Sequence, residues 1–203
     1  MATPDPAAAA SAAAHNDLYL HVRVIIGIVL GMSITRLLSG VARFVQHPGR
    51  DKVYPVHLAW AASILVLVIH FWWWEFRLTD VVTWTFPIYV FVVFYASLFY
   101  FLCVLLFPDD LRDYAGYEDY FLSRRRWFFA IFALTFVVDF LDTWLKGVDY
   151  MARFGPEYYV RAGVFIALSA LAMVLRSRLF HLAFVGLGFL YQLCWIFRMY
   201  DTL

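Results

Sequence analysis

The sequence predicts an all-α membrane protein, a bundle of six transmembrane helices, from its composition and from the spacing of its charges. Of its 203 residues, 64% are hydrophobic and 15% are charged, whereas soluble domains are about 45–50% apolar and about 25% charged. The mean hydropathy is +0.73. Several uncharged intervals reach the length of about 20 residues that crosses a hydrocarbon core about 30 Å thick. The formal net charge of +1 provides no basic surface for nucleic acid.

The first sixteen residues, MATPDPAAAASAAAHN, contain no Lys or Arg and no Leu-rich centre. They therefore lack the charged start and apolar core of a signal peptide. We expect residues 1–16 to form a disordered Ala-rich tail and residues 17–203 to form a single transmembrane domain.

Four spans are predicted from apolar length. Residues 53–74 and 81–108 contain no formally charged side chain, and 179–197 is a third such run. A further run is long enough to span if Arg161 extends toward the membrane surface. The four helices are expected at about 54–76, 81–107, 158–176 and 179–199.

Two more spans, about 20–43 and 127–149, carry charges inside their apolar runs. Arg36 interrupts the first, and Asp139 and Asp142 interrupt the second. A charge at the centre of a span costs about 2.5–3.5 kcal/mol on insertion scales, and flanking apolar residues offset this at about 0.3–0.6 kcal/mol each. Both segments are therefore predicted to span, the alternative being an amphipathic helix at the interface.

The basic residues of the loops predict the orientation. Six spans place both termini on one side, and the first, third and fifth loops hold nine Lys and Arg residues against six on the opposite side. Because cytoplasmic loops are enriched in Lys and Arg, both termini are predicted on the non-cytoplasmic side. The run of Arg124, Arg125 and Arg126 is interpreted as a topology anchor, with binding of anionic lipid headgroups as a second use.

A 3+3 inverted repeat is one interpretation of the helix order. Each predicted half begins with a charge-bearing helix followed by two apolar ones, and Tyr-x-Leu-Cys occurs at 100–103 and at 191–194. Transporters often contain such inverted halves. Chance similarity in an aromatic-rich chain is the alternative.

Small residues form a stripe along the first predicted helix. Gly27, Gly31, Thr35 and Ser39 recur every four residues, which places them on one face. Such small-xxx-small patterns let another helix approach closely. The stripe is predicted to be a packing seam, either within the bundle or between two copies.

Ionisable residues inside the membrane are the candidates for function. Arg36 needs an anion, carbonyls or water, and we expect it to pair with Asp139 or to extend to the cytoplasmic headgroups. Asp139, Asp142, Lys146 and Asp149 are spaced three, four and three apart, which predicts one charged helix face. Asp142 and Lys146 are expected to pair, leaving Asp139 as the deeper carboxyl, which either moves protons or only holds helices together.

The segment HFWWWEFR ends the second predicted span. Three successive tryptophans cover about 200° of a helix, so at least one must face lipid or the interface. Several polar side chains near this depth are expected to line an outward-facing cavity walled by aromatic rings. They are Arg23, His70, Glu75, Asp142 and Gln192.

The histidines allow a haem hypothesis, because haem iron is held by axial histidines. The four candidates are His21, His57, His70 and His181. His57 and His70 are thirteen residues apart, which separates them by about 140° around a helix and argues against stacked haems. Cys103 and Cys194 lie in apolar runs without further ligands, so no metal site is predicted.

No Walker A loop, GxSxG, HExxH or dinucleotide motif occurs, so no catalytic residue is assigned. The leading hypothesis is a membrane protein that conducts or binds a proton, an ion or a small amphipathic molecule. The alternatives are a non-catalytic assembly subunit of a membrane complex and a haem- or quinone-linked redox protein.

Overall fold

A computed structural model describes residues 6–49, 52–81 and 83–199. Its helical elements are α1 (Pro6–Gln46), α2 (Pro55–Trp74), the 3-10 helix η1 (Glu75–Asp80), α3 (Phe86–Leu106), α4 (Tyr117–Leu145), α5 (Val148–Ala152), α6 (Gly155–Val174) and α7 (Arg178–Met199). Six of these segments are long and apolar enough to cross a membrane. The predicted all-α bundle of six spans is therefore confirmed.

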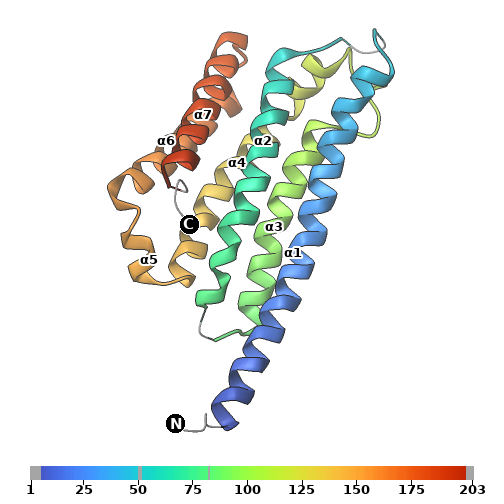
Figure 1. Ribbon diagram of the computed structural model, residues 1–203. Coiled ribbons are helices and arrows are strands. Elements are labelled where there is room, and N and C mark those ends of the chain that lie inside the picture. Colours follow the sequence, from blue (N-terminus) through green and yellow to red (C-terminus); the bar gives the residue numbers. More distant parts are fainter. Residues whose placement is uncertain (1–5, 50–51, 82, 200–203) are drawn as a thin grey trace.

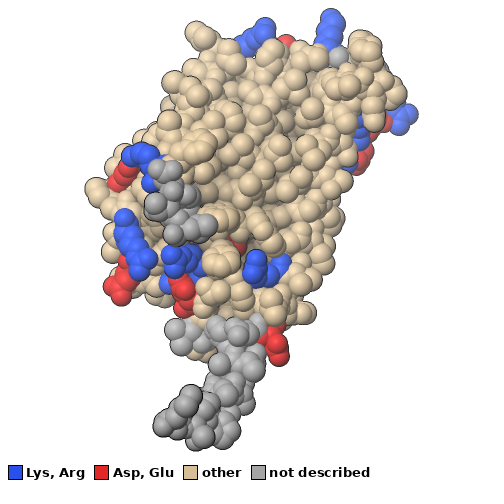
Figure 2. All heavy atoms as spheres, in the orientation of Figure 1, with Lys and Arg blue, Asp and Glu red and all other residues tan. Residues whose placement is uncertain are grey.

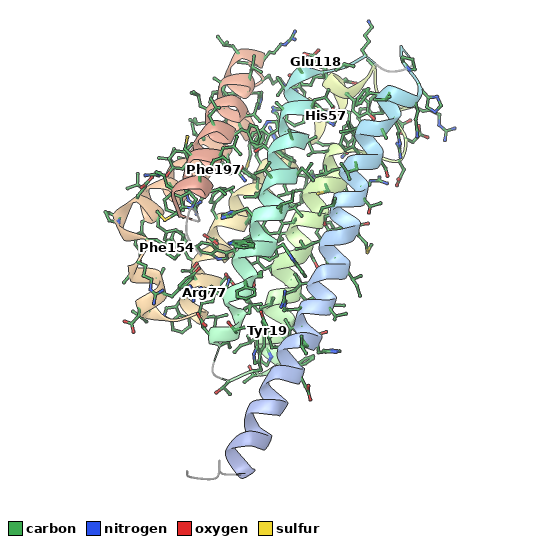
Figure 3. The ribbon with its side chains drawn as sticks, in the orientation of Figure 1. Tyr19, His57, Arg77, Glu118, Phe154 and Phe197 are labelled. Atoms are coloured by element: carbon green, nitrogen blue, oxygen red, sulfur yellow. The ribbon has the colours of Figure 1, made fainter. Side chains whose placement is uncertain are left out.

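The six long helices form an elongated bundle in which α1 and α7 lie on opposite sides (Figure 1). α1 packs along α3, α4 packs along α3 and α6, and α2 packs against α1, α3 and α7. Figure 3 labels His57 and Glu118 near one end of the bundle and Tyr19 and Arg77 near the other. The side view in Figure 2 shows charged side chains at the top and in the lower part, with a broad band of uncharged atoms between them.

The two halves of the chain do not pack alike. α1 packs most extensively along α3, the third helix of the first half, whereas α4 packs most extensively along α6, the second helix of its half. This difference does not fit the 3+3 repeat that the Tyr-x-Leu-Cys motifs suggested.

Helix α1 begins earlier than expected. It starts at Pro6 and runs to Gln46, so residues 6–16 are helical where a disordered tail was predicted, and residues 1–5 lie outside the described residues. Alanine has the highest helix propensity, and proline is favoured at the first helical position. The Ala-rich composition that was interpreted as a tail therefore extends the helix.

Glycines define the ends of α4, which also differs from its predicted range. Gly116 (φ 140°) precedes its first residue, Tyr117, and Gly147 (φ 121°) follows its C-cap. Both dihedrals lie in the region that only glycine adopts readily. α4 therefore starts about ten residues before the expected 127 and includes the three consecutive arginines, and it ends at Leu145 instead of 149.

Aromatic rings fill much of the core. Trp60 of α2 is 1% exposed, and its ring centroid lies 5.2–5.3 Å from those of Phe128, Phe129, Phe132 and Phe184. These contacts are edge-to-face, the arrangement that ring quadrupoles favour. One tryptophan thus joins α2, α4 and α7.

The small-residue stripe of α1 is not the internal seam. A Cβ at Gly31 would meet nothing within 4 Å, and a Cβ at Gly27 would lie 3.1 Å from the ring of Trp72. Thr35 and Ser39 are exposed. The close approach falls instead at Gly40, where a Cβ would lie 2.1–2.5 Å from ring atoms of Phe107. Within the bundle, α1 therefore makes its closest approach at Gly40, and the part of the stripe formed by Gly31, Thr35 and Ser39 faces outward.

Candidate functional site

A buried ionic cluster joins the end of α2 to the end of α4. Lys146, the C-cap of α4, places its Nζ 2.6 Å from Asp142 Oδ2 and 3.0 Å from Glu75 Oε1. The exposed fractions of the three side chains are 0%, 0% and 4%. Asp142 and Lys146 are one helical turn apart, so α4 supplies the pair that the spacing predicted, and η1 brings Glu75 to it from the other helix.

Trp74 connects this cluster to α2. Its indole N–H donates to Asp142 Oδ2 at 3.2 Å, and its backbone carbonyl accepts from Lys146 Nζ at 3.4 Å. Trp74 is buried, whereas Trp72 and Trp73 are 40% and 44% exposed. The expectation that at least one tryptophan faces outward is confirmed, and the buried one is a polar partner.

Asp139 forms a second polar group, one turn further into the bundle. Tyr158 donates to Asp139 Oδ2 at 2.8 Å and Tyr95 donates to Oδ1 at 3.2 Å. The guanidinium of Arg161 lies 3.7 Å from Oδ2. The Tyr158 hydroxyl also lies 2.9 Å from that of Thr143. Three helices, α3, α4 and α6, thus converge on one carboxylate.

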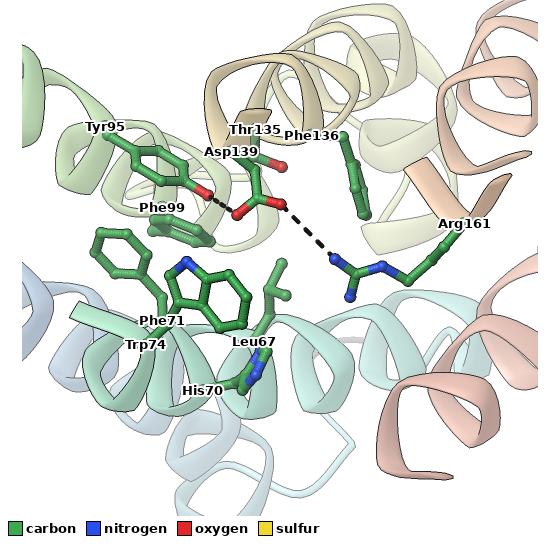
Figure 4. A pocket seen from close by; sticks show the side chains of 10 residues that line it. All are labelled: Leu67, His70, Phe71, Trp74, Tyr95, Phe99, Thr135, Phe136, Asp139 and Arg161. Carbon is green, nitrogen blue, oxygen red and sulfur yellow. Dashed lines mark hydrogen bonds and ion pairs between the residues drawn. The ribbon is translucent and has the colours of Figure 1, made fainter. Parts of the chain in front are cut away.

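A small cavity of about 40 Å³ opens beside Asp139 (Figure 4). Its lining residues are Leu67, His70, Phe71, Trp74, Tyr95, Phe99, Thr135, Phe136, Asp139 and Arg161. In Figure 4, Tyr95 and Arg161 approach Asp139 from opposite sides, and Trp74 and His70 of α2 lie across the cavity. A cavity needs about 10–15 Å³ of such volume and several polar partners to hold a water molecule, so this cavity is large enough for water.

The predicted pair between Arg36 and Asp139 is wrong. Arg36 Nη1 lies 2.6 Å from Asp109 Oδ1, in the segment between α3 and α4. Because α4 ends at Leu145, Asp139 lies about 9 Å from the end of its helix and not at mid-span. Arg36 lies about 15 Å from the end of α1, which is at the opposite end of the bundle. The two residues are therefore at different depths. The hydrogen bond and the charge of Arg36 hold the pKa of Asp109 below its usual value.

Asp149 does not belong to the charged face of α4. The chain leaves the helix at Gly147, and Asp149 is exposed on the short helix α5. The three-four-three spacing assumed one uninterrupted helix, and a glycine with positive φ breaks it.

The other polar residues expected at the cavity lie outside it. Gln192 Oε1 accepts from Ser63 at 3.4 Å. The guanidinium of Arg23 packs over Tyr19, Trp72 and Phe76 at 5.4–5.9 Å. Of the five polar residues that were predicted to line the cavity, His70 lines it. Glu75 and Asp142 form the adjacent cluster with Lys146.

The histidines do not converge as haem ligands would. His57 Nε2 lies 2.6 Å from the carbonyl of Leu106, and His181 Nε2 lies 3.0 Å from that of Leu175. His21 stacks on Tyr89, and His70 lines the cavity. Among the described residues, no group of three His, Cys, Asp or Glu side chains could hold a metal ion.

The three consecutive arginines have different environments. Arg125 is 6% exposed and donates to the carbonyls of Leu122 and Val174 at 2.5 and 3.4 Å. Arg124 donates to the hydroxyl of Tyr114, and Arg126 is exposed. Arg125 therefore holds the end of α6, and Arg124 and Arg126 are the exposed members of the run.

Sequence reasoning missed Arg161, Tyr95 and Tyr158 as partners of Asp139. Arg161 was interpreted as a snorkelling side chain at the end of a span, but it is 12% exposed and turns toward Asp139. The three-residue spacing of Tyr158 and Arg161 places both on one face of α6, a signal that could have been used. For Tyr95, no local pattern sets it apart from the other aromatic residues of α3.

The site therefore combines three carboxyls, two cations and a cavity large enough for water, inside an apolar bundle. No protein-family model, curated protein or solved structure matches this chain.

Proposed function

We propose that this integral membrane protein binds and conducts protons through the buried cluster on α2, α4 and α6. The observation that carries the proposal is a charge imbalance. The acidic members are Glu75, Asp139 and Asp142, and the basic members are Lys146 and Arg161. With all five ionised, one negative charge has no counter-charge. In a desolvated site, such an excess favours binding of a proton.

A proton fits the site better than a metal ion. The position between Glu75 and Asp142 is taken by the ammonium of Lys146, which contacts both carboxylates. Calcium needs six to eight oxygen ligands and magnesium a nearly octahedral shell. Glu75 Oε2 and Asp142 Oδ1 have no hydrogen-bond partner within the described structure, so each can carry a proton without displacing a neighbour.

The cavity supports exchange of that proton. Asp139 is 13% exposed and borders the cavity, whereas Asp142 is fully buried one turn away. Waters in the cavity would accept a proton from Asp139, and Trp74 lies between the cavity and Asp142. Asp139 is thus the entry carboxyl, and the lysine cluster holds the compensating charge.

Proton flux into liposomes containing the purified protein tests this function. An entrapped pH-sensitive dye would report the flux, with valinomycin and K⁺ setting the membrane potential. We expect the wild-type flux to exceed that of empty liposomes and Asp139→Asn to abolish the excess. Asp149→Asn is the matched control, because Asp149 is exposed on α5. If the double variant Glu75→Gln, Asp139→Asn conducts like wild type, the proposal fails.

A second candidate function is assembly into a larger membrane complex. The outward-facing stripe of Gly31, Thr35 and Ser39 favours it, because nothing in the described chain lies within 4 Å of a Cβ at Gly31. This function predicts that the protein co-purifies with other chains and that Gly31→Leu releases them. A mildly solubilised sample that runs as a lone monomer would exclude it.

A further inference from the structure

Three arginines gather at the end of the bundle where α4 and α7 begin and α6 ends (Figure 1). Arg125 of α4 is buried, and its guanidinium donates to the carbonyl of Val174, the last residue of α6, at 3.4 Å. Arg126 is exposed at the next position of α4, and Arg176 is exposed in the segment between α6 and α7. Arg125, Arg126 and Arg176 form an arginine cluster that two distant parts of the chain build together.

The arginine cluster has no carboxylate partner in the described chain. Arg125, Arg126 and Arg176 take part in none of the salt bridges between described residues. The charged groups that act on Arg125 are the other two arginines, which are also positive. The nearest acidic residues along α4 are Glu118 and Asp119, about two helical turns before Arg125. Like charges this close repel each other, so the cluster attracts an anion.

Phosphate is the anion that a pair of exposed guanidiniums suits best. A guanidinium presents its N–H groups as a planar fork, and this fork matches two phosphate oxygens. Arg126 and Arg176 are both exposed and can each supply such a fork. A headgroup that also carries an ammonium would bring a further positive charge to the cluster. The cluster therefore favours a phosphodiester whose headgroup is otherwise uncharged.

Exposed apolar side chains beside the cluster indicate that this phosphate belongs to a lipid. Trp127 follows Arg126 in the chain and is 65% exposed, and Val174 and Leu175, just before Arg176, are 71% and 40% exposed. Tryptophan is enriched at the level of the lipid headgroups. A soluble anion would gain nothing from these side chains, whereas acyl chains can lie against them.

We propose that Arg126 and Arg176 bind the phosphate of an anionic phospholipid of the phosphatidylglycerol type, whose acyl chains lie along Trp127 and Val174. Arg125 positions the site, because it holds the end of α6 against α4. The site is separate from the proton exchange inferred above, since Arg125 lies about 21 Å along α4 from Asp139. Lipid binding can therefore be measured without any flux.

Native mass spectrometry of the full chain in detergent tests the proposal. Titration with phosphatidylglycerol, and with phosphatidylcholine of the same acyl chains, gives the affinity for the first bound lipid. We expect wild type to bind phosphatidylglycerol more tightly. The double variant Arg126→Gln, Arg176→Gln should lower this affinity about tenfold to a hundredfold and leave that for phosphatidylcholine unchanged. Equal affinity of wild type for the two lipids would overturn the proposal.

The matched control is the double variant Lys52→Gln, Arg112→Gln. It removes two exposed positive charges from the same end of the bundle, outside the arginine cluster. We expect this variant to bind phosphatidylglycerol as wild type does. If it loses as much affinity as Arg126→Gln, Arg176→Gln does, the lipid responds to the general surface charge and the assigned site is wrong.

Glycerophosphoglycerol, the same headgroup without acyl chains, separates a lipid from a soluble phosphodiester. We expect an equal concentration of this compound to leave phosphatidylglycerol bound, because the acyl chains contribute to the binding. If glycerophosphoglycerol displaces the lipid at equal concentration, the cluster is a site for soluble phosphodiesters and the lipid assignment is overturned.

Discussion

Removal of the buried ammonium by Lys146→Met should strongly destabilise the bundle. Lys146 is the counter-charge of Asp142 and Glu75, at 2.6 and 3.0 Å, and none of the three side chains is more than 4% exposed. Breaking a buried ion pair by removing one partner costs about 3–5 kcal/mol, because the remaining charge is left desolvated and alone. We therefore expect the free energy of unfolding to fall by about 3–5 kcal/mol at neutral pH.

Reversible unfolding in mixed micelles, followed by tryptophan fluorescence, measures this loss. Arg77→Met is the control, because Arg77 is 49% exposed and lies 3.5 Å from Asp80. An exposed pair of this kind contributes about 0–1 kcal/mol. If Lys146→Met is no more destabilising than Arg77→Met, the cluster is not a desolvated ionic site and the reasoning is refuted.

Removal of the two carboxylates as well should recover most of this loss. The triple variant Glu75→Gln, Asp142→Asn, Lys146→Met leaves no desolvated charge among the three side chains. If the triple variant is as unstable as Lys146→Met in the same unfolding assay, the loss comes from packing and not from charge.

Two further predictions concern the opposite end of the bundle. Gly40→Ala should destabilise the fold by about 1–3 kcal/mol relative to Gly31→Ala in the same unfolding assay. The reason is that a Cβ at Gly40 would lie 2.1–2.5 Å from ring atoms of Phe107, whereas a Cβ at Gly31 would meet nothing within 4 Å. If the two variants are equally stable, the contact between Gly40 and Phe107 does not constrain α1. Arg36→Gln should raise the pKa of Asp109 toward its ordinary value, since the hydrogen bond and charge of Arg36 lower it, and carboxyl-carbon NMR titration would measure this. In wild type the lowered pKa stabilises the fold above the unfolded-state pKa, and this stabilisation is lost as pH falls; an unchanged titration in the variant would contradict the ion pair.

Local patterns determined the membrane class, the number of spans and the pairing of Asp142 with Lys146. Apolar length and a four-residue separation on one helix are properties of contiguous sequence, so they can be predicted without knowing how the helices pack. The helix ends were less predictable. Gly116 and Gly147 lie at the two ends of α4. A glycine in the sequence does not show by itself whether a helix ends there.

The partners of the ionisable residues were decided by tertiary structure. Arg36 pairs with Asp109 and Asp139 with Arg161, residues far apart in the chain. The sequence by itself required that Arg36 and Asp139 find partners inside or at the edge of the bundle, because isolated charges are costly there. Which partner each one found depended on helix depth, helix neighbours and side-chain direction. These are fixed only when the six helices pack together, and the cavity beside Asp139 and the arginine cluster exist for the same reason.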